Sequence, residues 1–238
     1  SWQNHELCYA TSDLPDRDFV FGGTIVSNGD VGYHGRSEKD RLNMTGTTHG
    51  SIECINGQWY VFYHRLTHKS DYSRQACAEP ITILPDGSIP QVEITSCGLN
   101  GKPLHGTGTY PAVIACNITN GHMPHGSNKI YTDSFPNATH CGEDRFIGEI
   151  QDGTMLGYKY FAFSGAKEIG VQYRGSCNGK FVVSDDMDGK NIVAEIPVAP
   201  ADAWTESRAP LHISDGTHPL YLFYRGDGEA AVKELYLA

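Results

Sequence analysis

The amino-acid sequence predicts an all-β protein. Hydrophobic residues make up 39% of the 238 positions and aromatic residues 11%, and the chain contains 27 glycines and 12 prolines. Short strand-like runs alternate with turn residues every few positions, which is typical of a propeller, sandwich or barrel. No stretch shows the apolar periodicity of a convincing amphipathic helix. We divide the sequence into a first unit (1–95), a glycine-rich linker (96–109) and a second unit (110–238).

The first unit contains short expected strands separated by turns and polar loops. These strands cover residues 6–10, 19–26, 52–55, 59–63 and 74–83. The strongest local signal is Asn56-Gly57, which lies between two strand-like runs, because both residues tolerate positive φ. We therefore expect a β-hairpin over residues 52–63.

The strands of the second unit are easier to recognise. They are expected at residues 112–116, 159–163, 169–173, 180–184, 192–198, 220–224 and 233–237. Turns such as Asp188-Gly189 and Asp215-Gly216 separate many of them. The length of this unit and the regular spacing of its strands are typical of a single β-sandwich.

Charge and hydropathy exclude some classes of partner. The net charge of −10 argues against nucleic acid, whose phosphates require basic patches, and it is compatible with a neutral polymer such as a polysaccharide. No stretch of the sequence is long and apolar enough to span a bilayer. The location stays open between extracellular and cytoplasmic.

The seven cysteines are widely spaced and include no C-x-x-C pair, so a zinc knuckle or redox motif is not expected. Cys54, Cys77 and Cys116 lie in strand-like runs and are interpreted as buried thiols. A single disulfide involving Cys116, Cys141 or Cys177 stays open.

Four segments of the first unit form a specific combination. They are NHELCYATS (4–12), DRDFVFGGTIVSNGD (16–30), HGSIECINGQWYVFYHR (49–65) and SRQACAEPI (73–81). In these segments the unit resembles the C-terminal part of the five-bladed β-propeller of glycoside hydrolase family 43.

The second unit resembles a family 6 carbohydrate-binding module, which is a jelly-roll β-sandwich. The resemblance rests on residues 152–175, on Trp204 with the Ala209-Pro210-Leu211 that follows it, and on GTHPLYLFYRGDG (216–228).

The resemblance implies an inverting glycosidase that removes terminal β-xylose or α-L-arabinofuranose from plant polysaccharide or oligosaccharides. One carboxylate of such an enzyme activates water and another is the acid. In the family these carboxylates precede the segment NHELCYATS, so no catalytic carboxylate is assigned to this chain. The local acids are interpreted as structural: Asp30, Asp40, Glu53 and Glu79.

The first unit is long enough for about two blades of some 40–45 residues, and two blades cannot close a ring. They would leave apolar faces and open strand edges. We therefore expect the N-terminal portion of the propeller to come from a second chain or from a missing segment.

His49 and Arg74 are the predicted site residues of the first unit. In the family the histidine of H-G-S points to the propeller axis and helps to hold a metal, often Ca²⁺, or a water. The arginine reaches the sugar, for which its fixed donor fork is suited. The alternatives are a hydrogen-bonded histidine in a polar core and an arginine in a surface salt bridge.

Trp204 is the predicted carbohydrate-binding residue of the second unit, where the family stacks a sugar on a tryptophan of a loop. The alternative is a core tryptophan. Glu149 stands where the second aromatic residue of the clamp is expected, and residues 229–234 lack the expected asparagine. These departures allow a module that chiefly supports the propeller. A non-catalytic carbohydrate-binding protein and a purely structural fragment are the rival functions.

Overall fold

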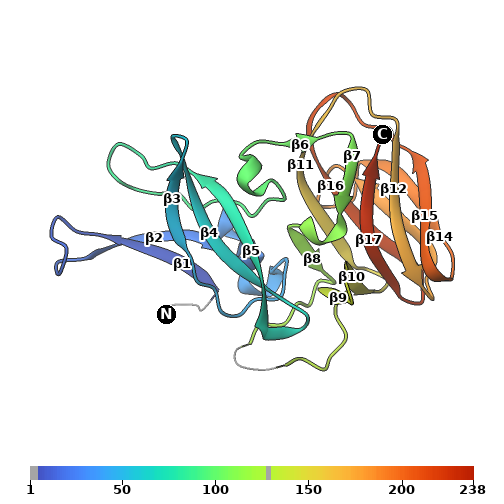
Figure 1. Ribbon diagram of the computed structural model, residues 1–238, viewed down its shortest axis with the longest axis horizontal. Helices are drawn as coiled ribbons and strands as arrows, with labels where there is room; N and C mark the ends of the chain where they lie inside the picture. The colour runs from blue at the N-terminus through green and yellow to red at the C-terminus, as the bar shows by residue number, and fades with distance from the viewer. Residues whose placement is uncertain (1–4, 127–129) are drawn as a thin grey trace.

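The computed structural model describes residues 5–126 and 130–238, which form two regions that lie side by side (Figure 1). We call residues 5–103 the propeller region and residues 104–238 the sandwich region. Apart from short 3₁₀ turns, the described residues form strands and loops. The predicted all-β fold is confirmed.

The propeller region contains a two-stranded sheet, β1–β2, and a three-stranded sheet, β3–β4–β5. Its elements are β1 (Glu6–Thr11), β2 (Val20–Ser27), η1 (Asn28–Asp30), η2 (Tyr33–Gly35), η3 (Glu38–Asp40), β3 (Ser51–Ile55), β4 (Gln58–Thr67), β5 (Ser70–Ile81) and η4 (Gly98–Asn100). The predicted hairpin is confirmed, because β3 pairs with β4 and Asn56 and Gly57 at its tip have φ of 51° and 84°.

The propeller region has apolar side chains on its surface. β3 lies at the edge of its sheet, and all of its residues are exposed. Phe19 and Val20, where β2 begins, are 60% and 66% exposed, and Trp59 on β4 is 38% exposed. Exposed apolar faces of this kind commonly mark interaction surfaces.

The sandwich region is built from two facing sheets of six strands each. One has the order β15-β12-β17-β10-β9 with β7 on β17, and the other has the order β14-β13-β16-β11-β6 with β8 on β11. The elements are β6 (Leu104–His105), β7 (Gly108–Pro111), η5 (Ala112–Ile114), β8 (Asn117–Thr119), β9 (Asn137–Cys141), β10 (Asp144–Ile150), β11 (Met155–Phe163), β12 (Glu168–Gly175), β13 (Asn178–Ser184), β14 (Ile192–Val198), β15 (Ala201–Pro210), β16 (Gly216–Asp227) and β17 (Ala230–Leu237).

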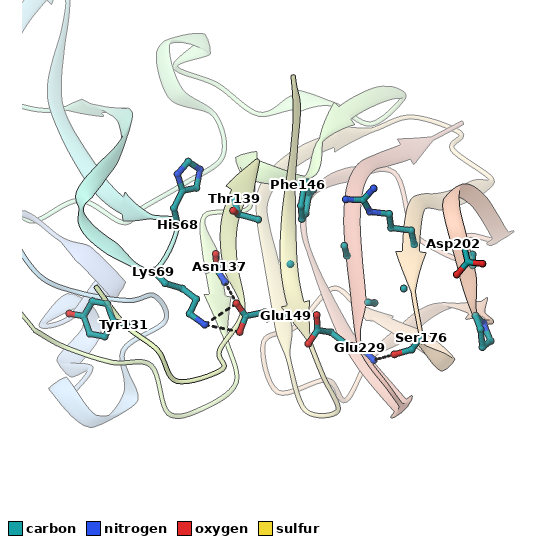
Figure 2. A pocket seen from close by; sticks show the side chains of 17 residues that line it. His68, Lys69, Tyr131, Asn137, Thr139, Phe146, Glu149, Ser176, Asp202 and Glu229 are labelled. Atoms are coloured by element: carbon teal, nitrogen blue, oxygen red, sulfur yellow. Dashed lines mark hydrogen bonds and ion pairs between the residues drawn. The ribbon is translucent and has the colours of Figure 1, made fainter. Parts of the chain in front are cut away.

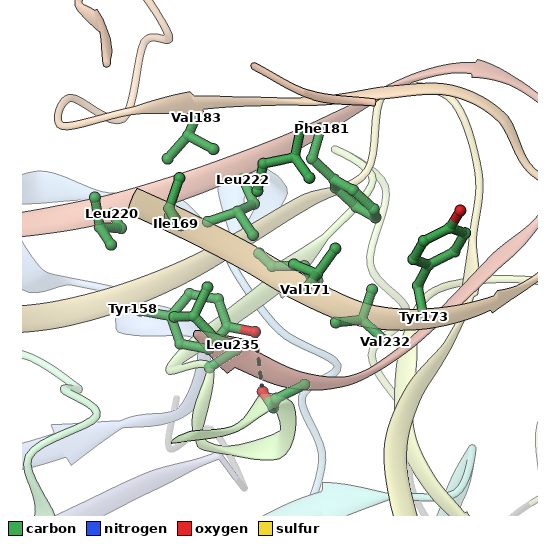
Figure 3. Packing of buried hydrophobic residues seen from close by; sticks show 14 of the residues in the cluster. Tyr158, Ile169, Val171, Tyr173, Phe181, Val183, Leu220, Leu222, Val232 and Leu235 are labelled. Carbon is green, nitrogen blue, oxygen red and sulfur yellow. Dashed lines mark hydrogen bonds between the residues drawn. The ribbon is translucent and has the colours of Figure 1, made fainter. Parts of the chain in front are cut away.

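The core of the sandwich region lies between these two sheets (Figure 3). Ile169 and Val171 of β12 share one cluster with Leu220 and Leu222 of β16, and all four side chains are fully buried. Burying a side chain of this size stabilises the fold by about 1.5–3 kcal/mol. Tyr158 joins the same core, and its hydroxyl donates to the Ala112 carbonyl at 3.2 Å.

Two expectations for the junction between the regions need correction. Part of the expected linker is structured, because β6 pairs with β11 and β7, which begins at Gly108, pairs with β17. Residues 112–114 form the 3₁₀ helix η5 instead of the predicted strand. The buried Arg65 guanidinium donates to the carbonyls of Val113 and Ala115, at 2.6 and 2.5 Å. The backbone here is therefore shaped by a contact with a residue distant in the sequence. The exact unit boundaries stay a prediction.

All seven cysteines are free thiols. Cys116 is buried, as predicted. Cys54 is exposed, which corrects the prediction, because it lies on the uncovered edge strand β3. Among the described residues, no helix could cross a membrane.

Candidate functional site

His49 precedes β3 at the surface of the propeller region. Its Nδ1 lies 3.3 Å from Nε2 of His64 on β4, and Thr48 Oγ1 donates to the His64 carbonyl at 3.0 Å. The next residue must be glycine, since a Cβ at Gly50 would lie 1.8 Å from the Phe62 carbonyl oxygen. His49 is exposed, so it is not the polar-core histidine of the alternative interpretation.

Arg74 lies on β5 and is exposed. Within the described part of the chain it forms no salt bridge, so the surface ion pair that was the alternative is not observed. Burial is the main cause that lowers the pKa of His64, and the charge of Arg74 and the nearby His49 lower it further. A neutral His64 and an unpaired guanidinium therefore lie close together.

Arg74 lines a groove of about 800 Å³ that we call the Arg74 groove. One wall comes from the β4–β5 hairpin and the other from the β9–β10 hairpin of the sandwich region. His140 and Arg145 are directly opposite each other on that second hairpin, and His140 Nδ1 lies 2.9 Å from His68 Nε2. Burial, His140 and Arg145 together lower the pKa of His68. Both regions thus shape the surface beside Arg74.

A second groove, of about 790 Å³, runs across the outer face of the sandwich region (Figure 2). We call it the module groove. At one end Lys69, in the β4–β5 turn, donates to both carboxylate oxygens of Glu149 at 2.9 Å, and the Asn137 amide donates to the same carboxylate at 3.2 Å. Glu149 stands where an aromatic clamp residue is expected. Its ion pair with Lys69 instead links the sandwich region to the propeller region.

Trp204 lies on strand β15 and not in the predicted loop. Its indole Nε1–H donates to Asp144 at 2.8 Å, and the guanidinium carbon of Arg174 lies 4.3 Å from the ring centroid. Hydrogen bonds from Lys233 and Trp204 lower the pKa of Asp144. Trp204 is not among the residues that line the module groove. Its half-buried ring is engaged in cross-strand contacts, and sugar binding by it stays a prediction.

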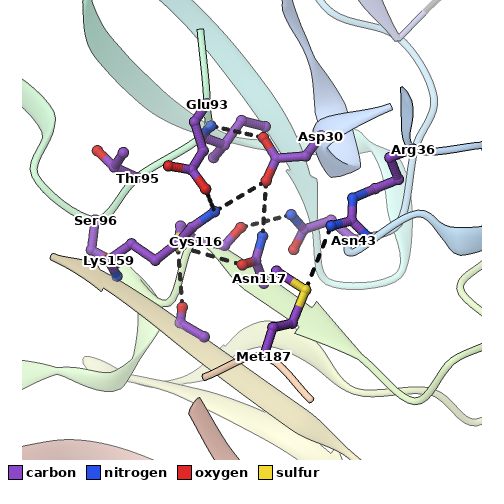
Figure 4. A network of polar contacts seen from close by, with 12 residues as sticks. Asp30, Arg36, Asn43, Glu93, Thr95, Ser96, Cys116, Asn117, Lys159 and Met187 are labelled. Carbon is purple, nitrogen blue, oxygen red and sulfur yellow. Dashed lines mark hydrogen bonds and ion pairs between the residues drawn. The ribbon is translucent and has the colours of Figure 1, made fainter. Parts of the chain in front are cut away.

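A buried charged network joins the two regions (Figure 4). Lys159 of β11 is fully buried, and its ammonium lies 3.2 Å from Asp30 and 2.8 Å from Glu93. Asn117 of the sandwich region also donates to Asp30, at 3.3 Å. Asp30 accepts a further bond from the Ile94 backbone N–H at 2.8 Å. Asp30 is therefore a structural carboxylate.

Glu79 is a buried acid of the propeller region. It accepts hydrogen bonds from the Thr95 backbone and hydroxyl, at 2.8 and 2.6 Å, and from the Tyr63 hydroxyl at 3.1 Å. Burial nevertheless raises the pKa of Glu79 to about 8. A shifted pKa can mark a catalytic acid, but this side chain, which borders a cavity of about 370 Å³, is only 1% exposed and its carboxylate is occupied by the three hydrogen bonds above. Its geometry is that of a structural acid.

Sequence reasoning did not find Lys159 or Lys69. A lysine between Tyr158 and Tyr160 in a strand is a local signal for a buried, paired charge, since lysine is almost never fully buried alone. The two acidic partners of that lysine, Asp30 and Glu93, are 129 and 66 residues away in the sequence, so only the tertiary structure identifies them.

No family model matches the chain. It is 43% identical over 247 residues to a xylosidase/arabinosidase from Thermoclostridium stercorarium, in an alignment that covers 98% of this chain and 51% of that protein. The chain therefore spans about half the length of this curated relative.

Two solved structures align with the chain, and the first of them shares its fold. A glycoside hydrolase family 43 arabinoxylan arabinofuranohydrolase from Bacillus subtilis, in complex with cellotetraose, aligns with 98% of this chain and 47% of its own, at TM-score 0.52 and 19% identity. A family 6 carbohydrate-binding module from Clostridium cellulolyticum, in complex with xylose, aligns with 56% of this chain and 98% of its own, at TM-score 0.47 and 15% identity. The chain is thus similar in sequence to half of a xylosidase/arabinosidase and has the fold of part of a family 43 glycoside hydrolase, and the predicted resemblance to that family is confirmed.

Proposed function

We propose that this chain forms the C-terminal portion of an inverting glycosidase that removes terminal β-xylose or α-L-arabinofuranose from plant polysaccharide or oligosaccharides. The observation that carries the proposal is the 43% identity to a xylosidase/arabinosidase over nearly the whole chain. The catalytic carboxylates belong, in this proposal, to N-terminal blades outside these 238 residues, in the same polypeptide or in a second chain. The exposed edge strand β3 and the apolar residues around it support such a partner.

In this proposal, Arg74 binds substrate. Its guanidinium is exposed and unpaired in the described structure, and a rigid fork of five N–H donors suits vicinal sugar hydroxyls. A guanidinium cation beside the catalytic acid would also lower the pKa of that acid, compared with a site that has no charge nearby. Both carboxylates of an inverting enzyme flank the scissile bond about 6.5–9.5 Å apart, which leaves room for the attacking water.

The predicted axial role of His49 is to help hold a metal ion, often Ca²⁺. Calcium takes six to eight oxygen ligands, whereas His49 is paired with a second imidazole, that of His64. Among the described residues, the one group of three His, Cys, Asp or Glu side chains that could share an ion does not include His49. The side chains described around His49 do not by themselves fit calcium. We therefore assign His49 only a positioning role in the site, with no step through a metal.

The test measures release of nitrophenol from nitrophenyl β-xyloside and from nitrophenyl α-L-arabinofuranoside. The sample must contain the N-terminal blades, and native mass spectrometry verifies that they are present. Arg74→Ala should lower kcat/KM by about 10²-fold, the usual loss when one charge-stabilising donor is removed. Arg17→Ala, which removes an exposed arginine paired with Asp16, is the matched control and should leave activity unchanged. Full activity of the 238-residue chain alone would contradict our placement of the carboxylates, and inactivity on both glycosides would contradict the reaction.

The module groove supports a second candidate function, which is carbohydrate binding by the sandwich region alone. Its volume of about 790 Å³ is in the range of small-ligand sites. Binding of xylo-oligosaccharides by the chain, abolished in Trp204→Ala, would favour this function over the enzymatic one and would place the sugar on Trp204, outside the groove. Binding that survives Trp204→Ala but not a substitution of Glu229 would place the sugar in the groove itself.

A further inference from the structure

Three side chains from distant segments converge outside the two grooves. They are His5 just before β1, Glu38 in η3 and His125 in the segment that follows β8. One donor atom of each lies within 4.8 Å of the other two. His5 Nε2 is 2.5 Å from Glu38 Oε1, and the two imidazole rings stand edge to face with centroids 5.5 Å apart.

Both imidazoles are oriented by hydroxyl groups on their other nitrogen. His5 Nδ1 lies 2.9 Å from Ser27 Oγ, and His125 Nδ1 lies 2.8 Å from Thr45 Oγ1. Ser27 and Thr45 are themselves fully buried. Hydrogen bonds of this kind fix the ring orientation of histidines that ligate metals, and here they leave Nε2 of each ring for a shared ligand.

Glu38 is held in a similar way. Arg41 donates to its Oε2 at 3.0 Å, which leaves Oε1 toward His5. A simple ion pair between His5 and Glu38 would account for two of the three residues. It would not account for His125, whose Nδ1 is already engaged and whose ring faces the pair.

We propose that His5, Glu38 and His125 bind one divalent transition-metal ion of the zinc class. Two imidazoles and one carboxylate are a ligand set that zinc accepts, with water in the fourth position. Calcium and magnesium prefer oxygen ligands and are poor candidates. Donors about 2.1 Å from a tetrahedral ion lie about 3.4 Å from one another, so Glu38 moves by about 1 Å on binding. Its side chain is 36% exposed and has room to do so.

The ion would connect the two regions of the molecule. His5 and Glu38 belong to the propeller region, whereas His125 belongs to the sandwich region and forms a backbone bridge to Thr45. A metal at this point would stabilise the contact by binding the folded chain and not the unfolded one. This site is independent of the proposed glycosidase function.

The experiment titrates metal-free 238-residue chain with Zn²⁺ by calorimetry and follows thermal unfolding. We expect one Zn²⁺ per chain and a rise in Tm of about 5–10 °C at 100-fold excess over Kd. His125→Ala should weaken binding at least about 10-fold. The matched control is His122→Ala, an exposed histidine three residues away, which should bind as the wild type does.

A spectroscopic measurement separates ligation from stability. Co²⁺ added to the metal-free chain should produce the visible absorption of a four-coordinate site, and Glu38→Gln should weaken or shift it while circular dichroism shows an unchanged fold. Equal Zn²⁺ affinities of His125→Ala and His122→Ala, or loss of binding in His140→Ala instead, would overturn the assignment. Binding of Ca²⁺ or Mg²⁺ with equal affinity would overturn the metal class.

Discussion

The sandwich region and the propeller region bury their apolar residues to different degrees. The sandwich region closes two sheets over one core, in which residues such as Phe181 and Leu222 are fully buried. The main apolar cluster of the propeller region is smaller, and Cys116 of the sandwich region completes it. The core of the sandwich region is therefore formed by residues of that region alone, whereas the main core of the propeller region includes a residue from outside its own sheets.

The contact between the regions includes a buried polar network. Lys159 and Asp30 are charged groups removed from water, which are tolerated only when paired, and Glu93 beside them is partly exposed. Breaking a buried pair is more costly than the net stability it adds, because one charge is left uncompensated. This network should therefore be the most sensitive part of the interface.

The largest expected effect comes from Lys159→Met, which removes the buried cation and leaves Asp30 and Glu93 facing each other. We expect a loss of about 3–5 kcal/mol in the free energy of unfolding, measured by chemical denaturation. The matched control is Lys180→Met, since Lys180 pairs with Glu195 at the surface and should change stability by no more than about 1 kcal/mol. Equal losses in the two variants would show that the buried network does not hold the regions together.

The next effect tests the sandwich core against the propeller surface. Leu222→Ala should cost about 2–5 kcal/mol, because it leaves a cavity among fully buried side chains. Ile52→Ala on the exposed strand β3 should change the free energy of unfolding by no more than about 0.5 kcal/mol. A large loss in Ile52→Ala would mean that β3 is covered in solution, which would itself reveal a partner.

An effect that is smaller per pH unit than the losses above is expected from Glu79. Its pKa in the folded chain is about 8, above the ordinary value, so the folded state holds the proton more tightly than the unfolded state. Stability should therefore fall as pH rises between about 4.5 and 8, by at most about 1.4 kcal/mol per pH unit, and then level off. Glu79→Gln should lack this fall.

The measurement for Glu79 is a series of denaturation curves between pH 5 and pH 9 on wild type, Glu79→Gln and the exposed control Glu195→Gln. The control should follow the wild type. If Glu79→Gln followed it too, the titration of Glu79 would not contribute to the pH dependence of stability.

The smallest effect concerns the link at the module groove. Lys69→Ala removes a partly exposed ion pair with Glu149 and should cost about 1 kcal/mol or less. Reversing the pair, with Lys69→Glu and Glu149→Lys together, should restore part of that loss. Chemical denaturation monitored by circular dichroism would show it, and an unchanged free energy of unfolding in Lys69→Ala would mean that the contact positions the groove without stabilising it.

Local features of the sequence predicted much of the fold. The Asn56-Gly57 hairpin follows from the φ preferences of two adjacent residues, and most strands follow from short alternating runs. The predictions were wrong where a distant group decides the local structure. Residues 112–114 bend into a 3₁₀ turn whose carbonyls meet Arg65, and Trp204 lies on a strand, beside Arg174.

The candidate site was predicted only in part. His49 and Arg74 came from a motif, and the structure places them near each other through His64. The β9–β10 hairpin, with His140 and Arg145, was not expected beside Arg74, because nothing in its sequence indicates which surface it faces. The cluster of His5, Glu38 and His125 was missed for the same reason.

The sequence by itself determined the all-β class, the hairpin and the resemblance to a glycosidase family, because periodicity, turn residues and motifs act over a few adjacent positions. Only the tertiary structure decided the partners of Lys159 and Glu149, the exposure of β3 and the convergence of His5 with His125. These contacts join residues that are tens of positions apart or more, and they depend on how the two regions pack.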